Sequence, residues 1–368
     1  MAGAWWIFCR VIDNFGDAGV SWRLSCQLSR HLGHPVDLVI DDWQTLARLE
    51  PALGDEPLEN RAITTRGVRV WSWRRLEEQP EKLETSDPQV LVSGFSCELP
   101  EAVRFGLQQW KVAPLWILFE YLSAEAWVDD CHARPSPISS YPGQRYFYFP
   151  GFTRYSGGLL REPGLLDDRD DWQQNHSRPG WVAQAQRWLT LWAYPEAPWL
   201  ALHEAICQDP ELWGWCLFEG AALTNCILEH GLASIPVRVI PFQTQGNYDV
   251  CLWDADLNLV RGEDSFVRAQ WAGKPLLWHI YPQEDGSHWN KLNAFLDIYL
   301  DGVEHSLAMA IRALFLAWNG KGAIVHCWQQ VREQWGLWEL HARYWSRTLA
   351  MQPDLVTRLV EFVENKLE

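Results

Sequence analysis

A short acidic turn near the start of the chain, residues 13–19 (DNFGDAG), has the residue types of a substrate-binding turn. It lies between a strand-like run and an amphipathic run, which places it at the carboxyl end of a first strand and the start of a first helix. Gly16 and Gly19 allow a backbone turn and close approach of a ligand. Helix capping would explain Asp17 alone, but a second aspartate four residues before it exceeds what a cap needs. The residues that we expect to engage substrate here are Asp13, Asn14, Phe15, Gly16 and Asp17.

A second turn with the same placement, residues 261–265 (RGEDS), follows a strand-like run and precedes a helical one. Helix-start amides attract anions, so a diphosphate fits on these amides and on the Ser265 hydroxyl, with Arg261 supplying positive charge. Glu263 would then point into the site, where a carboxylate can accept a proton or hold a cation. The simpler alternative is that Asp264 or Ser265 only caps the helix.

A loop after another strand-like run, residues 241–248 (PFQTQGNY), carries groups suited to a planar base. Phe242 and Tyr248 could stack on the base, while Gln243 or Gln245 reads its edge. Because aromatic residues after a strand are usually packing residues, this loop alone is a weak candidate.

A further loop, residues 279–285 (HIYPQED), ends another strand-like run of the same half of the chain. Tyr281 and Gln283 could meet sugar hydroxyls. The alternative is a capped loop with ordinary exposed polar residues.

Several motifs of other enzyme classes are absent from the sequence. No GxGxxG follows the first strand and no GxxxxGK[ST] occurs, which weakens dinucleotide oxidoreductase and P-loop interpretations. No HExxH or GxSxG occurs either. The triplet from Asp254 to Asp256 has the DxD form that holds a metal in one glycosyltransferase architecture, but acidic triplets are common by chance, so no metal site is predicted.

Composition restricts the class of protein further. The 368 residues suggest two domains, and the net charge of −16 disfavours nucleic acid as a partner. The nine cysteines form no CxxC pair, so buried free thiols are expected. No apolar run reaches membrane-spanning length and no signal peptide is recognised, so we expect a cytoplasmic protein without a membrane partner.

The first half of the chain alternates strand-like and helical runs, which is typical of a parallel sheet with helices on both faces. Leucines and a valine spaced by four residues predict a helix that ends at Gly33. The alternation breaks at the aromatic, glycine-rich residues 141–155. The expected strands are residues 5–12, 35–41, 68–73, 90–95 and 115–122, and further helices are expected at 43–53 and 101–110.

The second half repeats the alternation after a polar stretch, residues 167–180, that predicts an exposed loop or connector. The expected strands are residues 189–194, 212–218, 236–242, 256–260 and 275–281, with helices at 199–208 and 264–272 and almost all helix from Trp289 onward. The final helix, residues 353–368, could pack back on either domain.

These patterns predict an α/β fold with two Rossmann-like domains that face one another across a cleft. The expected boundaries are residues 1–155, a connector at 156–181, and residues 182–350. Ligands of such sheets bind at the carboxyl ends of the strands.

Two long segments resemble a known family. They are VIDNFGDAGVSWRL (residues 11–24) and LVRGEDSFVRAQWAGKPLLWHIYPQEDGSHWNKLNAFLD (residues 259–297). They resemble the EarP family of protein-arginine rhamnosyltransferases, which modify bacterial elongation factor P, and the resemblance covers essentially the whole chain.

The resemblance implies a GT-B glycosyltransferase that inverts the anomeric centre and needs no metal or other cofactor. The implied donor is dTDP-β-L-rhamnose, held mainly by the C-terminal domain. The implied acceptor is an arginine of elongation factor P, bound through the N-terminal domain. The functional carboxylates of the family correspond to Asp13, Asp17 and Glu263. The implied nucleotide contacts are Tyr194, Phe242, Gln245, Asp264 and Ser265, with Gln243 and Tyr248 as near neighbours.

Two alternatives stay open. One is a GT-B enzyme with another nucleotide sugar and another acceptor, such as a lipid-linked glycan. The other is a non-catalytic protein that uses the same fold for binding, which the presence of all three carboxylates disfavours.

Overall fold

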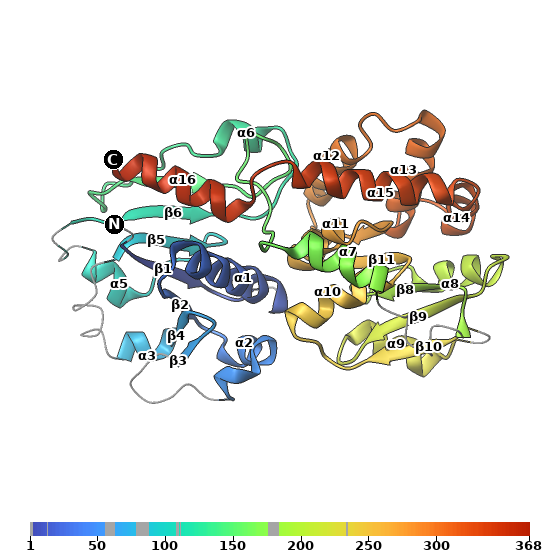
Figure 1. The fold of residues 1–368 in the computed structure, drawn as a ribbon, viewed down its shortest axis with the longest axis horizontal. Coiled ribbons are helices and arrows are strands. Elements are labelled where there is room, and N and C mark those ends of the chain that lie inside the picture. Colours follow the sequence, from blue (N-terminus) through green and yellow to red (C-terminus); the bar gives the residue numbers. More distant parts are fainter. Residues whose placement is uncertain are drawn as a thin grey trace. The chain divides into compact units, whose positions relative to one another are not determined.

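The chain forms two compact α/β units, seen in a computed structural model (Figure 1). The structure describes residues 3–12, 14–55, 63–78, 88–107, 110, 112–175, 184–232 and 235–368. The first unit comprises Met1–Glu162 together with Gln352–Glu368, and the second comprises Pro163–Met351. The second unit therefore begins within the predicted connector.

The first unit contains a seven-stranded sheet with the order β3-β4-β2-β1-β5-β6-β7. Its neighbouring strands pair in parallel, except that β3 and β4 are antiparallel. The strands are β1 (Ala4–Cys9), β2 (Val36–Ile40), β3 (Ile63–Thr65), β4 (Val68–Ser72), β5 (Pro88–Gly94), β6 (Leu115–Phe119) and β7 (Arg145–Tyr148). The five strands expected in this half are confirmed, whereas β3 and β7 were not anticipated.

Helices cover both faces of this sheet. They are α1 (Asn14–Leu32), α2 (Trp43–Leu49), α3 (Trp73–Glu78), α5 (Glu101–Gly106), α6 (Trp127–Cys131), α16 (Leu355–Leu367) and the short 3-10 helix η1 (Pro51–Leu53). The predicted end of α1 is confirmed, because Gly33 follows it with a φ of +71°. Helix α16 lies beside α1 in this unit (Figure 1). On the other face, α3 and α5 pack against Trp6 and Phe8.

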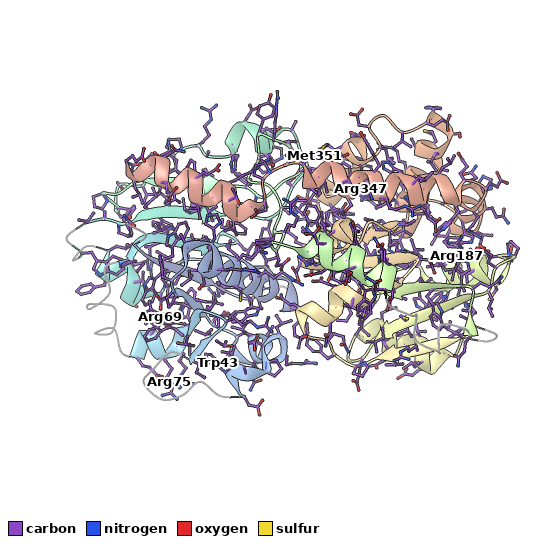
Figure 2. The ribbon with its side chains drawn as sticks, in the orientation of Figure 1. Trp43, Arg69, Arg75, Arg187, Arg347 and Met351 are labelled. Carbon is purple, nitrogen blue, oxygen red and sulfur yellow. The ribbon has the colours of Figure 1, made fainter. Side chains whose placement is uncertain are left out.

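A buried ion pair links two central strands of the first sheet. Asp37 of β2 is fully buried, and it accepts hydrogen bonds from the Arg69 guanidinium at 2.8 and 2.5 Å and from the Trp71 indole at 2.7 Å. Burial raises the pKa of Asp37, and Arg69 opposes that rise. Figure 2 labels Arg69 among the side chains of this unit.

The second unit contains a five-stranded, all-parallel sheet with the order β10-β9-β8-β11-β12. The strands are β8 (Arg187–Leu191), β9 (Trp213–Phe218), β10 (Val237–Ile240), β11 (Leu257–Arg261) and β12 (Leu276–His279). All five predicted strands of this half are confirmed. Arg187 at the start of β8, labelled in Figure 2, bonds to Glu211 at 2.5 Å and to Glu339 at 2.8 Å.

Nine helices are found among the described residues of the second unit. They are α7 (Leu165–Asn175), α8 (Trp199–Cys207), α9 (Ala222–His230), α10 (Gln245–Asp254), α11 (Asp264–Ala272), α12 (Ser287–Tyr299), α13 (His305–Trp318), α14 (Ile324–Arg332) and α15 (Trp335–Ala350). The mostly helical end of the chain and the helix at residues 264–272 were predicted. Gly273, with a φ of +63°, closes α11.

The loop expected at residues 167–180 is wrong through Asn175, where α7 forms, and residues 176–180 lie outside the described part of the chain. Tertiary contacts explain this helix better than its polar composition does. The buried Arg169 donates to the Trp271 carbonyl at 2.7 Å and to Ser346 at 3.0 Å, and the Trp172 indole donates to Asp254 at 2.8 Å.

All nine cysteines are free thiols, as predicted, but only Cys9, Cys97, Cys216 and Cys327 are buried. Cys26, Cys131 and Cys251 are half-buried, and Cys207 and Cys226 are exposed. Within the described residues, no helix combines the length and the apolar character needed to cross a bilayer.

Candidate functional site

Each sheet has one point where the strand order reverses, and such switch points are where doubly wound sheets bind ligands. In the first sheet, β2 lies on one side of β1 and β5 on the other, so the switch point is between β1 and β5. In the second, it lies between β8 and β11. The acidic turn follows β1, the RGEDS turn ends β11, and Tyr194 follows β8. Asp17, Tyr194 and the residues of the RGEDS turn therefore lie at the two switch points, whereas residues 242–248 follow the edge strand β10 and residues 281–283 follow the edge strand β12.

The acidic turn of the first unit is held by Asp17. This residue lies in the first turn of α1 and is only 3% exposed, and its carboxylate accepts the Ile12 backbone N–H at 2.8 Å. Asp17 thus stabilises the exit from β1, a structural role that is compatible with catalysis. Asp13 and the Asn14 side chain lie outside the described residues.

The glycines of this turn do not form the backbone turn that the sequence suggested, and their close approach to a ligand stays a prediction. Because α1 begins at Asn14, Gly16 and Gly19 lie inside the helix instead of forming the turn. Phe15 also lies in the helix and packs under the Arg48 guanidinium, which is 5.1 Å from the ring centroid. The first unit thus holds its turn through Asp17 rather than through glycine flexibility.

Four further residues lie at this edge that sequence reasoning missed. Phe95 and Ser96 follow β5 with φ values of +56° each, and Glu120 and Tyr121 follow β6. The sequence carries no signal for them, because left-handed backbone at a phenylalanine and a serine cannot be read from residue type.

Arg261 is the centre of the second switch point. Its guanidinium lies over the Trp192 ring at 4.9 Å and over the Tyr194 ring at 4.6 Å. Tyr281, 62% exposed, stands edge-on to Tyr194 at 5.4 Å. Three predicted site residues, Arg261, Tyr194 and Tyr281, therefore lie together in the structure. Trp192, which was not predicted, lies beside them. An arginine fixed between aromatic rings is pre-oriented for an anionic group such as a phosphate.

His279 fixes the loop that carries Tyr194. The Tyr194 backbone N–H donates to His279 Nδ1 at 3.2 Å. Burial lowers the pKa of His279 to about 4, with a smaller contribution from the charge of Arg261. The imidazole is therefore a neutral acceptor near neutral pH.

Glu263 occupies the position before α11 without capping it. Gly262 precedes it with a φ of +62°, and the Trp278 indole donates to the Gly262 carbonyl at 3.0 Å. The Glu263 side chain makes no capping bond to α11 and instead meets Lys291 Nζ of α12 at 3.1 Å. The Lys291 ammonium thus holds the Glu263 carboxylate at the switch point. The sequence analysis did not identify Lys291 as a site residue.

The beginning of α11 places Asp264 and Ser265 at the same edge, in its first turn. Tyr248 packs against Phe218 with ring centroids 5.3 Å apart, and it joins the core cluster around Trp188. Burial raises the pKa of Tyr248, and the neighbouring Ser265 side chain partly offsets the rise. Tyr248 is thus a packing residue at the base of the site.

The loop residues 241–244 lead into α10, a helix that the sequence analysis did not anticipate at Gln245. Gln243 donates to the Pro241 carbonyl at 2.6 Å, which folds its amide onto its own loop. Phe242 is partly exposed. The roles of Phe242, Gln243 and Gln245 in reading a base stay predictions.

The second loop is ordered around Gln283. Its backbone N–H donates to His288 Nδ1 at 3.0 Å, and its side-chain oxygen accepts the Ser287 hydroxyl at 2.6 Å. Burial lowers the pKa of His288. Tyr281 and Gln283 are therefore presented on a loop pinned to the start of α12.

The acidic triplet at the end of α10 has structural roles. Asp254 accepts the Trp172 indole N–H at 2.8 Å, and Asp256 accepts the Trp188 backbone N–H at 2.9 Å. Across the described ranges, no group of three or more histidine, cysteine or acidic residues could hold a metal ion.

Comparisons with known proteins decide the family. Residues 5–364 match the family model described as Elongation-Factor P (EF-P) rhamnosyltransferase EarP. The chain belongs to the EarP family. It is 40% identical to the protein-arginine rhamnosyltransferase of Pseudomonas aeruginosa, with 98% of each chain covered, and 34% identical to that of Shewanella oneidensis, with 99% and 98% covered.

Solved structures support the same family and fold. The chain is similar to a protein from a structural study of EarP-mediated arginine glycosylation of translation elongation factor EF-P, with 30% identity, a TM-score of 0.65 and 99% of each chain covered. Arabidopsis thaliana UGT89C1 complexed with UDP matches at a TM-score of 0.58 over 99% of each chain, but at 9% identity. That second likeness concerns the fold alone, which is the predicted GT-B type.

Proposed function

We propose that this protein transfers L-rhamnose from dTDP-β-L-rhamnose to an arginine side chain of elongation factor P, with inversion at the anomeric carbon. Membership of the EarP family and the names of its relatives support the acceptor and the sugar. The observation that carries the donor half is the second switch point, where Arg261 is fixed between Trp192 and Tyr194 next to the start of α11.

The reaction joins two charged partners. A guanidine nitrogen of the acceptor forms a bond to C1 of rhamnose, and the C1–O bond breaks with its electron pair leaving on dTDP. Inversion requires the nitrogen to attack in line, from the face opposite the diphosphate. The nitrogen's proton passes to a carboxylate as the new bond forms, because a guanidinium holds its protons up to about pH 12.

The carboxylates divide this work in the proposal. Asp17 accepts the proton, and Asp13 or Glu263 pairs with the remaining N–H groups and prevents rotation. Negative charge that develops on dTDP is stabilised by Arg261 and by the amides at the start of α11. Glu263 is half-buried and its carboxylate pairs with the Lys291 ammonium at 3.1 Å.

No metal or other cofactor takes part in the proposed reaction, and neither nucleic acid nor membrane is a partner. Protein dipoles and Arg261 take the role that a metal has in DxD enzymes. The engagement of Asp254 and Asp256 by Trp172 and Trp188 supports this assignment. The reaction is expected in the cytoplasm, where elongation factor P acts.

Mass spectrometry of elongation factor P, after incubation with this protein and dTDP-β-L-rhamnose, tests the proposal. The expected result is one added deoxyhexose on one arginine. Wild-type protein without donor, and Asp17→Asn with donor, serve as controls. Unmodified elongation factor P together with transfer from another nucleotide sugar would support a different GT-B reaction. Binding of elongation factor P without any transfer would support the non-catalytic alternative.

A further inference from the structure

The first unit has a second group of residues, at the ends of β5 and β6 beside its switch point, that the proposed reaction does not use. Strands β5 and β6 end side by side, with Gly94 opposite Phe119 in the register. The next residues along each strand are Phe95 and Ser96 after β5, and Glu120 and Tyr121 after β6. All four therefore lie at the carboxyl edge, where ligands of such sheets bind.

The backbone at this corner is held in an uncommon conformation. Phe95 and Ser96 both have a φ of +56°, and the Cys97 N–H donates to the Gly94 carbonyl at 3.0 Å. Positive φ at both central residues is the pattern of a type I′ turn, which normally contains asparagine and glycine. The Phe95 N–H is tied in addition to the Phe119 carbonyl at 2.6 Å. Because of this turn, the Phe95 and Ser96 side chains leave the backbone in directions that an extended strand end does not allow.

The first of these side chains supports an aromatic surface. The Phe95 ring stacks on Tyr121 with centroids 4.8 Å apart and an interplanar angle of 27°. Phe95 is buried, whereas Tyr121 is 37% exposed. A partly exposed aromatic ring that is fixed by stacking suits a planar cation such as a guanidinium.

The second side chain holds a carboxylate beside that surface. The Ser96 hydroxyl lies 3.0 Å from one oxygen of Glu120 and 3.3 Å from the other, and the Glu120 backbone N–H donates to the Tyr148 carbonyl at 3.0 Å. Burial raises the pKa of Glu120, and Ser96 opposes the rise. Among the residues that the structure describes, no lysine, arginine or histidine is paired with Glu120. A partly buried carboxylate is costly unless a cation compensates it.

We infer that Glu120 and Tyr121 form a guanidinium-binding subsite for the acceptor protein. The carboxylate would pair with the guanidinium N–H groups while the tyrosine ring lies against its plane, and Ser96 and Phe95 position these two groups. The inference rests on the proposed function, because it assigns the ligand to the acceptor. The guanidinium belongs either to the arginine that is modified or to a second arginine of the same acceptor surface.

Kinetics with elongation factor P test the subsite. Glu120→Gln keeps the size of the side chain and its contact with Ser96 but removes the charge, and Tyr121→Leu removes the aromatic face. Each is expected to raise the acceptor KM about tenfold while the donor KM stays constant, because a hydrogen bond to a charged group is lost or a stacked cation is released. Tyr121→Phe should restore the wild-type KM.

Two further variants distinguish a loss of acceptor binding from a loss of folding or a change in net charge. Glu364→Gln removes one equally negative charge from an exposed position of α16 in the same unit, and it should leave the acceptor KM unchanged. Ser96→Gly suits the positive φ and keeps the Glu120 charge but removes the hydroxyl that positions it, so it should fold and raise the acceptor KM by less than Glu120→Gln does. Thermal unfolding of each variant reports whether the unit is intact.

A double-mutant cycle identifies the source of the guanidinium. If Glu120 binds the modified arginine, replacing that arginine by lysine should remove most of the effect of Glu120→Gln on the acceptor Kd. If Glu120 binds a second arginine, the effects of Glu120→Gln and of replacing the modified arginine should be additive. Replacement of the second arginine should then couple with Glu120→Gln. Unchanged acceptor KM and Kd in folded Glu120→Gln and Tyr121→Leu would overturn the inference. Wild-type protein that transfers no rhamnose would instead overturn the proposed function.

Discussion

The two switch points of this protein differ in the charge that they present. At the first, Asp17 and Glu120 lie at the edge, and the nearby Arg10 faces Asp41 at 4.0 Å. At the second, Arg261 is held between two aromatic rings and Lys291 pairs with Glu263. The same sheet architecture therefore offers one edge to a cation and the other to an anion.

The difference teaches how one fold assigns two substrates. In the proposed function, a net charge of −16 favours a cationic acceptor, whereas a nucleotide diphosphate needs a local positive site. In that proposal Arg261 supplies the positive charge, and its stacking on Trp192 and Tyr194 fixes the guanidinium in place. The acidic edge needs no additional charged group in the proposal. A guanidinium can pair there with carboxylates such as Asp17, which already accepts a backbone N–H.

The largest expected effect comes from the acidic edge. Asp17→Asn should lower rhamnose transfer at least about a hundredfold, because the proton acceptor is lost. The asparagine oxygen can still accept the Ile12 N–H, so the melting temperature should stay close to wild type. Single-turnover transfer to elongation factor P measures the effect. Full transfer by Asp17→Asn would show that another carboxylate is the base.

The second switch point, which contains Arg261, should respond through donor affinity. Arg261→Ala removes both the charge and the stacked plane, and we expect dTDP to bind about thirtyfold more weakly. Arg261→Lys keeps the charge without the planar fork and should give an intermediate affinity. Calorimetric titration with dTDP provides the values. Arg312→Lys, which alters an arginine paired with Asp297 in the same unit, is the matched control. Equal affinity for all three variants would remove Arg261 from the donor site.

A smaller effect is expected from the ion pair between Glu263 and Lys291 at the second switch point. Lys291→Met leaves Glu263 without its cation, and kcat for transfer should fall roughly tenfold. If the two residues act as one unit, Lys291→Met should have little further effect in a Glu263→Gln background. Steady-state kinetics of the single and double variants give the coupling. Strict additivity would mean that the ion pair serves only to join α11 to α12.

Acid should weaken both units to a similar extent. His132 in the first unit accepts the Phe149 N–H at 3.1 Å, and His279 has the same role toward Tyr194. Burial lowers the pKa of each from 6.5 to about 4. The unfolded chain therefore binds protons that the folded protein excludes, so this stability is complete above pH 6.5 and decreases as the pH falls toward 4.

By about pH 5.5 each histidine should cost about 1 kcal/mol of unfolding free energy. His132→Gln and His279→Gln remove the titration one unit at a time, and calorimetry at neutral and acidic pH measures the change. If either substitution leaves the pH dependence of the unfolding free energy unchanged, that histidine does not make the expected contribution.

No effect at all is expected from removing metal ions. Asp254 and Asp256 already accept hydrogen bonds from tryptophan groups, and Arg261 supplies the charge that a metal would bring. Transfer measured with and without EDTA should be equal. Strict dependence on magnesium or manganese would return the DxD triplet to the site and weaken the contrast between the two edges.

Much of the fold could be predicted because the strands are continuous apolar runs separated by helices. Each predicted strand is present, and Gly33 after α1 marks a helix end as expected. Helix α7 was missed because its stability comes from Arg169 and Trp172, which bond to residues distant in sequence. Strand β7 was missed because its apolar residues are aromatic and lie among glycines and prolines.

The candidate site was predictable only where a motif carries it. The turns containing Asp17 and Glu263 follow the strands that flank the switch points, which strand order alone defines. Trp192, Lys291 and Glu120 are ordinary residues in the sequence, and they matter because of what the fold places beside them. Tyr248 shows the converse, since its place in a promising loop did not reveal that it packs in the core.

The position of α16 has a consequence for how the chain is made. Five of its side chains are buried in the first unit: Leu355, Val356, Leu359, Val360 and Val363. The second unit is therefore an insertion in the first, and the first lacks part of its core until synthesis reaches the last residues. A chain that ends before Leu355 would therefore contain the whole of the second unit, while the first unit would lack these five core side chains.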